Sequence, residues 1–278
     1  MMKRVVNIIM FDFLLHPFII RSILIGIILA ISTSLISNYL VSSNQSLIGD
    51  GLAHISFTGV VIGVLLSNNP FYVAIPIAIL ASILIKFLMR SNKLHGDTAI
   101  GLVSSFALAI GFILISKSTG FNMSVESMLV GSIFSTKWID VLYSGIMLIL
   151  VLIFVIFSYK KLFTITFDST YAKFSKIKEV YYDYTLAALT AVVVVVGVQI
   201  IGTLLISAFI IFPAVSGSLI AKSFKHMVIN SVIINVFVTI TGIIIGHFLS
   251  FPAGSTIIVL YGITFGVLYL YKLIRRIE

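Results

Sequence analysis

Residues 138–157 read WIDVLYSGIMLILVLIFVIF, a stretch of 20 residues in which Asp140 is the single charged side chain. An apolar segment of about 20 residues is what an α-helix needs to cross the hydrocarbon core of a bilayer. Similar runs recur along the whole sequence, which predicts an all-α, polytopic transmembrane helical bundle. The runs lie at 18–41, 47–66, 71–89, 98–116, 138–157, 184–200, 203–221, 227–250 and 255–271. The sixth and seventh, separated by Gly202, are two spans or one broken helix, so we expect eight or nine spans.

The overall composition supports the same class. The chain has 278 residues, of which 60% are hydrophobic and 10% charged, whereas soluble domains have about 45–50% apolar and about 25% charged residues. Residues 1–278 are therefore predicted to form one transmembrane domain. The absence of cysteine excludes disulfide bonds and thiolate metal sites. The first run exceeds the apolar part of a signal peptide, so we expect no cleavable signal.

Lys and Arg gather between the apolar runs. In a membrane chain, the net charge of +9 indicates topology determinants and lipid-headgroup contacts rather than nucleic-acid binding. With nine spans, four basic groups fall on one side, predicted to be the cytoplasm because cytoplasmic loops carry an excess of Lys and Arg. The N-terminus is then outside and the C-terminus inside. The groups are Lys86, Arg90 and Lys93; Lys160, Lys161, Lys173, Lys176 and Lys178; Lys222 and Lys225; and Lys272, Arg275 and Arg276.

Two polar residues interrupt the second run, Asp50 and His54 within the segment GDGLAH at 49–54. Residues four apart lie on the same side of a helix. Ionisable side chains inside a membrane segment are expensive, and they mark ion or substrate pathways by default. Carboxylate and imidazole are both metal ligands. Gly59 and Gly63 lie on the opposite face, where small residues allow a neighbouring helix to approach closely.

The same pair has a plainer interpretation, in which Asp50 only caps its helix and His54 hydrogen-bonds a neighbour. Two ligands also do not fill a tetrahedral zinc site, and a homodimer with its axis beside this helix would supply four. Asp12 and His16 repeat the spacing, but they precede Pro17 in a segment typical of a wet interfacial helix. His247 is a headgroup-level histidine or a weak ligand for an entering ion. Gln199 is expected to be a buried polar residue that bonds another helix, and with His247 it forms a possible secondary pathway.

The longest polar interval, at about 159–183, is basic and aromatic. Within it, residues 167–172 predict one or two helical turns capped by Asp168, and Asp97 and Asp183 are expected to cap the fourth and sixth spans. A short helix along the inner face suits docking to a soluble partner, although an ordinary positive-inside loop has the same composition.

The sequence lacks a phosphate-binding loop of the form Gly-x-x-x-x-Gly-Lys-Ser/Thr, so the chain is not expected to hydrolyse ATP. It also lacks the His-Glu-x-x-His and Gly-x-Ser-x-Gly motifs of metalloproteases and serine hydrolases. The nine acidic residues sit mostly at span ends, which gives an ion-coupled antiporter little support. We therefore expect a transport subunit rather than an enzyme.

With these motifs in view, the chain resembles the membrane permease subunits of bacterial ATP-binding-cassette importers for zinc and manganese, and the zinc-uptake permeases most closely. The likeness covers nearly the whole sequence. Where many relatives carry paired arginines before the second span, this chain has Ser42-Ser43-Asn44-Gln45. The matching pieces, in order, are GDGLAH at 49–54 with SFTG at 56–59, DTAIG at 97–101, VGSI at 130–133, FDSTYA at 167–172, Pro213-Ala214 and PAGST at 252–256.

The resemblance implies a dimeric pore in the bacterial cell membrane, two cytoplasmic ATP-binding subunits and an extracellular metal-binding protein that delivers the ion. By the match, Asp50 and His54 would contact the metal, and Phe167, Asp168 and Ala172 would belong to the loop that meets the ATPase. We expect a divalent metal importer working by alternating access, for zinc first and manganese or iron second. The ion is cargo, and no permanently bound cofactor is expected.

Two other classes stay open. An iron-chelate permease would need a wide polar cavity, and few polar residues lie within the spans. A membrane enzyme using Asp50 and His54 as acid and base would work without an ATPase. Since histidine binds metal only when neutral, the importer hypothesis predicts weaker transport at acidic pH.

Overall fold

A computed structural model describes residues 16–66, 70–91, 94–117 and 131–277. Every regular element in these ranges is helical, and nine helices are long and apolar enough to cross a membrane. A six-residue helix, α8, and a 3-10 turn, η1, complete the described elements. The bounds are α2 Pro17–Ser42, α3 Ile48–Leu66, α4 Phe71–Ser91, α5 Gly96–Lys117, η1 Ile133–Ser135, α7 Trp138–Phe167, α8 Ser169–Phe174, α9 Glu179–Ile201, α10 Thr203–Ile220, α11 Phe224–Phe248 and α12 Ala253–Ile277.

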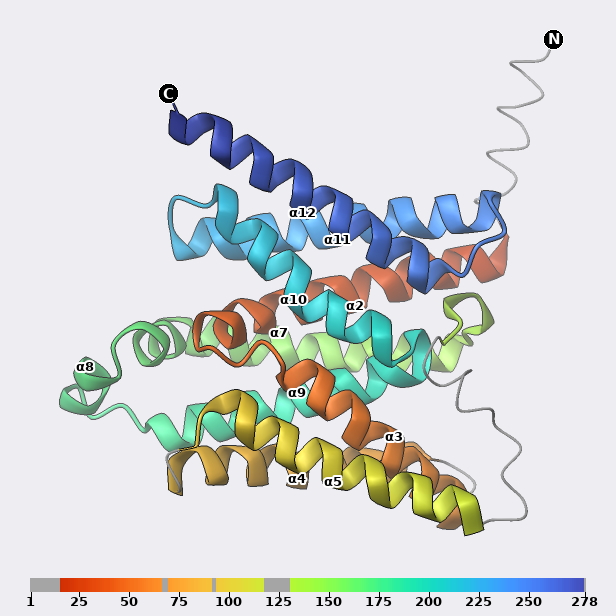
Figure 1. The fold of residues 1–278 in the computed structure, drawn as a ribbon, viewed down its shortest axis with the longest axis horizontal. Helices are drawn as coiled ribbons and strands as arrows, with labels where there is room; N and C mark the ends of the chain where they lie inside the picture. The colour runs from red at the N-terminus through yellow and green to blue at the C-terminus, as the bar shows by residue number, and fades with distance from the viewer. Residues whose placement is uncertain (1–15, 67–69, 92–93, 118–130, 278) are drawn as a thin grey trace.

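The sixth and seventh runs are two separate helices, which makes nine spans rather than eight in the described chain. Gly202 alone joins α9 to α10, with φ 86° and ψ 165°. That backbone conformation is open to glycine and strongly disfavoured for other residues. The chain therefore reverses direction within one residue (Figure 1).

Successive spans run in opposite directions, so the connections gather at two ends of the bundle (Figure 1). One end carries the connections α2–α3, α4–α5 and α10–α11, the segment around α8, and the C-terminus. The predicted basic groups lie at this end, apart from Lys93, which falls outside the described residues. Under the positive-inside rule this end faces the cytoplasm.

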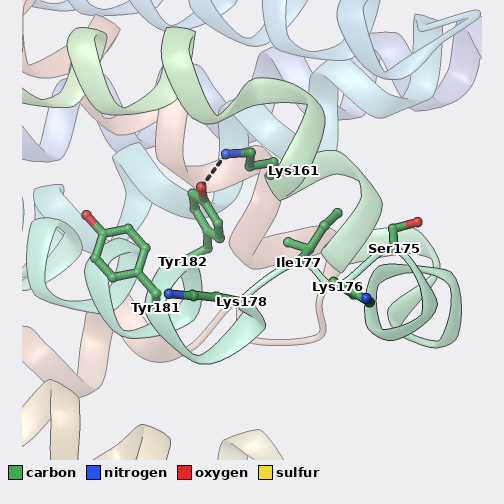
Figure 2. Close-up of a pocket in the computed structure, with 7 residues that line it drawn as sticks. All are labelled: Lys161, Ser175, Lys176, Ile177, Lys178, Tyr181 and Tyr182. Carbon is green, nitrogen blue, oxygen red and sulfur yellow. Dashed lines mark hydrogen bonds between the residues drawn. The ribbon is translucent and has the colours of Figure 1, made fainter.

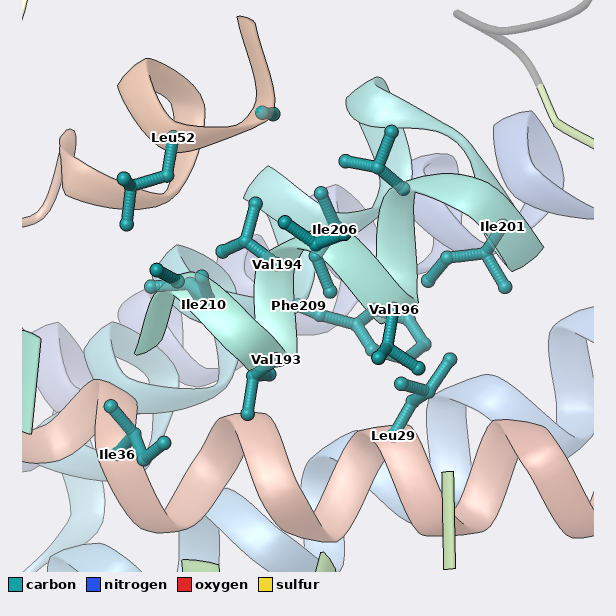
Figure 3. Packing of buried hydrophobic residues seen from close by; sticks show 14 of the residues in the cluster. Leu29, Ile36, Leu52, Val193, Val194, Val196, Ile201, Ile206, Phe209 and Ile210 are labelled. Carbon is teal, nitrogen blue, oxygen red and sulfur yellow. The ribbon is translucent and has the colours of Figure 1, made fainter. Parts of the chain in front are cut away.

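The centre of the bundle is formed by α2, α3, α9 and α10, whose aliphatic side chains meet in Figure 3. In α9 every residue from Val193 to Val198 is buried. A helix that is apolar on all sides is one surrounded by other helices. The outermost helix, α12, is mostly exposed in the single chain, as expected for a face that meets lipid or a partner.

Gly59 and Gly63 allow α4 to pack tightly on α3. A methyl group on Gly59 would come within 2.8 Å of the Ala74 Cα, and one on Gly63 within 2.7 Å of the Pro70 Cα. Without those methyl groups the two backbones come into contact, which adds van der Waals packing where lipid provides no hydrophobic drive. The predicted close approach of a neighbouring helix on this face is confirmed.

Asn235, fully buried in α11, joins four helices through its side chain. Its amide nitrogen donates to the Ala30 carbonyl at 3.0 Å, and it also reaches Thr33, Ser34 and the Phe209 carbonyl. Its amide oxygen accepts a hydrogen bond from the Tyr261 hydroxyl of α12. Interhelical hydrogen bonds of this kind hold membrane bundles together.

Two predicted helix caps are wrong. The fourth span begins at Gly96, so Asp97 lies inside its first turn. The sixth begins at Glu179, one turn before Asp183. The sequence places the start of each span at its first apolar residue, but α9 continues outward as a polar helix because the end of α4 packs against it. By contrast, the Asp168 carboxylate accepts the Tyr171 backbone N–H at 2.8 Å, so the predicted cap of α8 is confirmed.

Candidate functional site

Asp50 and His54 lie one turn apart at the beginning of α3, with His54 Nε2 3.6 Å from Asp50 Oδ2. The other carboxylate oxygen, Oδ1, is 3.2 Å from the hydroxyl of Ser207 in α10. The structure thus brings together the two predicted residues and adds a third polar group from a helix distant in sequence. Nothing in the spacing of Ser207 singles it out, because its relation to Asp50 exists only when α3 and α10 pack.

The glycines on each side of Asp50 explain how it is held. A methyl group on Gly49 would come within 2.6 Å of the Ile210 Cδ1 of α10, and one on Gly51 would overlap the Ile100 side chain of α5. Successive helical residues point about 100° apart, so Asp50 projects between the directions in which these two helices approach. The glycines therefore let α5 and α10 close around α3 while the carboxylate stays between them.

Asp50 and His54 are the partly exposed side chains of an otherwise buried part of α3. Of residues 48–61, they are the two that are not buried, with side chains 52% and 34% exposed. A half-exposed carboxylate facing lipid is strongly disfavoured. The open side of this pair therefore calls for water, an ion or another protein surface.

The pair is held by contacts that reach α3 from two sides. The α2–α3 linker is drawn into the bundle by Gln45, whose Oε1 accepts from Lys86 Nζ at 2.8 Å, and Lys86 precedes the end of α4 by five residues. Ser207, on the other side, is in the second turn of α10, which starts at the opposite end of the bundle. Asp50 is thus held between contacts that come from both ends.

The structure places His247 in α11 and Gln199 in α9. His247 lies in the last turn of α11, and its ring packs against Phe18 and Phe134 with centroids 6.1 Å apart in both cases. Gln199 is exposed, so the prediction of a buried Gln199 is wrong. Between residues 193 and 201 of α9, Gln199 is the one exposed residue, and no neighbouring helix of the described chain covers that side of the last turns. Asp12 lies outside the described residues.

The polar interval 159–183 is mostly helix rather than loop. α7 continues to Phe167, and α8 projects from the bundle at its basic end (Figure 1). Ala172 anchors α8 with a fully buried methyl group. On the outer side, Phe174 is 83%, Tyr171 60% and Phe167 56% exposed. Large apolar side chains on a projecting helix are typical of an interaction surface.

Beside α8 lies a cavity of about 450 Å³, which Figure 2 shows. Lys161 points to the Tyr182 hydroxyl and lies 2.7 Å from it. The amines of Lys176 and Lys178 point in opposite directions in this view. Because the amines do not converge, the cavity is a basic surface beside α8 and not a closed anion site. Its lining residues are Lys161, Ser175, Lys176, Ile177, Lys178, Tyr181 and Tyr182.

The model of the ABC 3 transport family matches residues 15–272. The chain belongs to the ABC 3 transport family. As an ABC 3 family member with nine apolar helices in its described residues, it is a multi-pass protein of the bacterial cell membrane and a transport subunit rather than an enzyme.

Relatives of this ABC 3 family chain match it over most of their length. The manganese import system permease protein ScaB of Streptococcus gordonii is 31% identical over 89% of both chains. The high-affinity zinc uptake system membrane protein ZnuB of Haemophilus influenzae is 25% identical over 90% of this chain and 96% of its own.

Solved structures show the same fold. PsaBC from Streptococcus pneumoniae in complex with Fab superposes with a TM-score of 0.82 at 28% identity, covering 93% of this chain and 94% of that one. An inward-facing conformation of a putative metal-chelate type ABC transporter has a TM-score of 0.74 at 16% identity, covering 91% and 86%. The second likeness concerns the fold alone.

Proposed function

We propose that this protein is the permease of an ATP-driven importer of a divalent metal ion, and that Asp50 and His54 contact the ion on its way. The observation that carries the proposal is the exposure pattern of α3, which is buried from residue 48 to 61 except at these two side chains. The matched relatives named for manganese and zinc import support the choice of cargo. An iron chelate would need a wide polar cavity, and few polar residues lie within the spans, so a chelate is a poorer fit.

One chain supplies an incomplete set of ligands. Among the described residues no cluster of three or more His, Cys, Asp or Glu side chains exists, whereas a bound zinc ion has four ligands. A second copy related by an axis beside α3 would add another carboxylate and imidazole, and would also cover the exposed side of Asp50. A site shared in this way opens when the copies move apart, which is what a transported ion requires, since a closed site would trap it.

The surface formed by α8 and the basic cavity beside it is the proposed docking site for a cytoplasmic ATP-binding subunit. Phe167, Tyr171 and Phe174 offer apolar contact, and the fold holds α8 by the Asp168 cap and the buried Ala172. Nucleotide binding in that partner would move α8 and drive alternating access. An extracellular metal-binding protein would deliver the ion to the opposite end.

Zinc and manganese are separated by a direct competition. Carboxylate and imidazole serve both ions, so the donor pair does not choose between them. Vesicles that hold the permease and its co-purified ATPase are expected to accumulate radioactive zinc or manganese only when ATP is supplied. The preferred ion suppresses uptake of the other at equal concentration. Uptake without ATP, or the absence of an ATP-hydrolysing subunit after gentle purification, contradicts the importer.

Uptake is also expected to fall as the pH is lowered. An ordinary imidazole has a pKa of about 6.5, and its protonated form no longer binds metal. As the pH falls, fewer permeases therefore hold a neutral His54 that can bind the ion. The measurement is ion uptake per ATP hydrolysed from pH 7.5 to 5.5 at saturating ATP, so that a slower ATPase does not imitate the effect. A flat ratio across this range removes His54 from the ion's path.

A further inference from the structure

A charged cluster at the basic end connects α9, which follows α8, with α4. Arg90, in the last turn of α4, approaches two carboxylates of α9, Glu179 at 3.8 Å and Asp183 at 3.7 Å. Glu179 and Asp183 are one turn apart, so both face Arg90. Their side chains are 11% and 29% exposed, which limits the screening of these ion pairs by water.

The segment between α8 and α9 is short and bonded along its backbone. The Ile177 N–H donates to the Ala172 carbonyl at 3.0 Å, and the Glu179 N–H donates to the Ile177 carbonyl at 2.8 Å. A displacement of α8 therefore reaches the first turn of α9, and through Glu179 and Asp183 it reaches Arg90. These contacts attach the end of α4 to the proposed docking helix.

Lys86 lies one turn before Arg90 on α4 and is only 5% exposed. Its ammonium donates to the Gln45 side chain at 2.8 Å, and Asp183 and Arg90 are the charged groups that act on it electrostatically. An amine buried within a span is a functional candidate by default, because its desolvation is expensive. The transport site described above makes no use of it.

Gln45 connects Lys86 to the start of α3 through backbone hydrogen bonds. Its own N–H donates to the Leu40 carbonyl at the end of α2 at 2.9 Å, and its carbonyl accepts the Ile48 N–H, the first of α3, at 3.2 Å. The linker holds Asn44 at φ 55°, a conformation uncommon outside glycine. Asp50 follows Gln45 by five residues, so a shift of this linker moves the start of the helix that carries the metal-contacting pair.

We propose that Arg90 and Lys86 transmit the movement of α8 to α3, through Glu179 and Asp183 on one side and Gln45 on the other. The inference rests on the proposed import function and adds to it the residues that couple the ATPase to the ion site. Arg90 and Lys86 act as positioning residues that touch neither ion nor nucleotide. Replacing either residue is expected to leave ion binding and ATP hydrolysis in place but to uncouple ATP hydrolysis from ion import.

The test uses the permease–ATPase complex in vesicles, with ion uptake and ATP hydrolysis measured together. Lys86→Met and Arg90→Gln are each expected to lower the number of ions imported per ATP about tenfold, within the usual range of coupling between sites. Ion binding to the detergent-solubilised complex is expected to stay within about twofold of the wild type, since neither residue contacts Asp50 or His54. The matched control is Lys225→Met, which removes an exposed lysine from α11.

A combined variant guards against misfolding. Gln45→Leu with Lys86→Met replaces the buried polar pair with apolar side chains, a change that membrane and soluble cores tolerate because no buried charge is left unpaired. We expect this variant to be folded and uncoupled. Wild-type coupling in the folded double variant, or in both single variants, overturns the proposal. Uptake by His54→Ala at the wild-type rate contradicts the proposed ion site instead, so the two failures are distinguishable.

Discussion

His54→Ala and Asp50→Ala are each expected to lower ATP-driven metal uptake at least tenfold, with protein levels matched. Each substitution removes one of the two ligands that a chain offers, and in a dimer it removes two from the shared site. Changes to groups that only support a metal ligand already reduce affinity or activity about 10- to 100-fold, so loss of a ligand is expected to reach that range. The measurement is the initial rate of radioactive metal uptake into vesicles or cells.

Matched controls for this pair are available at the end of the bundle. His95→Ala and Asp97→Ala remove an imidazole and a carboxylate from exposed positions near the start of α5. They are expected to keep uptake near the wild-type rate. Asp50→Asn adds a finer comparison, because the amide retains the contact with Ser207 but loses the charge that binds a cation. Wild-type uptake in His54→Ala would show that the ion takes another route.

Asn235→Ala is expected to destabilise the bundle by about 2–3 kcal/mol. An unsatisfied buried group costs about 1–3 kcal/mol, while interhelical hydrogen bonds in membranes average about 0.6 kcal/mol. Here the loss removes the Asn235 acceptor of the Tyr261 hydroxyl and the bonds to α2 and α10. The measurement is the free energy of unfolding in mixed detergent.

Asn230→Ala provides the control, because Asn230 is a half-buried asparagine of the same helix, α11. That variant is expected to lose less than about 1 kcal/mol, as most substitutions away from a buried network do. Equal unfolding free energies for Asn230→Ala and Asn235→Ala would mean that the Asn235 contacts do not hold the four helices together.

The predicted ion site could be identified from local spacing, but its surroundings could not. Asp50 and His54 are recognisable because they are four residues apart in an apolar run. Ser207 and Lys86 are not, since an isolated serine or a basic residue near a span end has many ordinary explanations. Gln199 illustrates the opposite error, because a polar residue in an apolar run is expected to be buried, yet α9 leaves its side chain uncovered.

By itself the sequence determined the class of fold and limited the number of spans to eight or nine, because in a bilayer each apolar run must satisfy its own backbone hydrogen bonds as a helix. The Asp168 cap is local in the same sense. Which side of α3 stays open, and which residues join α4 to α9 and to the α2–α3 linker, depended on the tertiary structure. Those contacts join residues 41 to 157 positions apart, and only the packing of whole helices brings such groups within hydrogen-bonding distance.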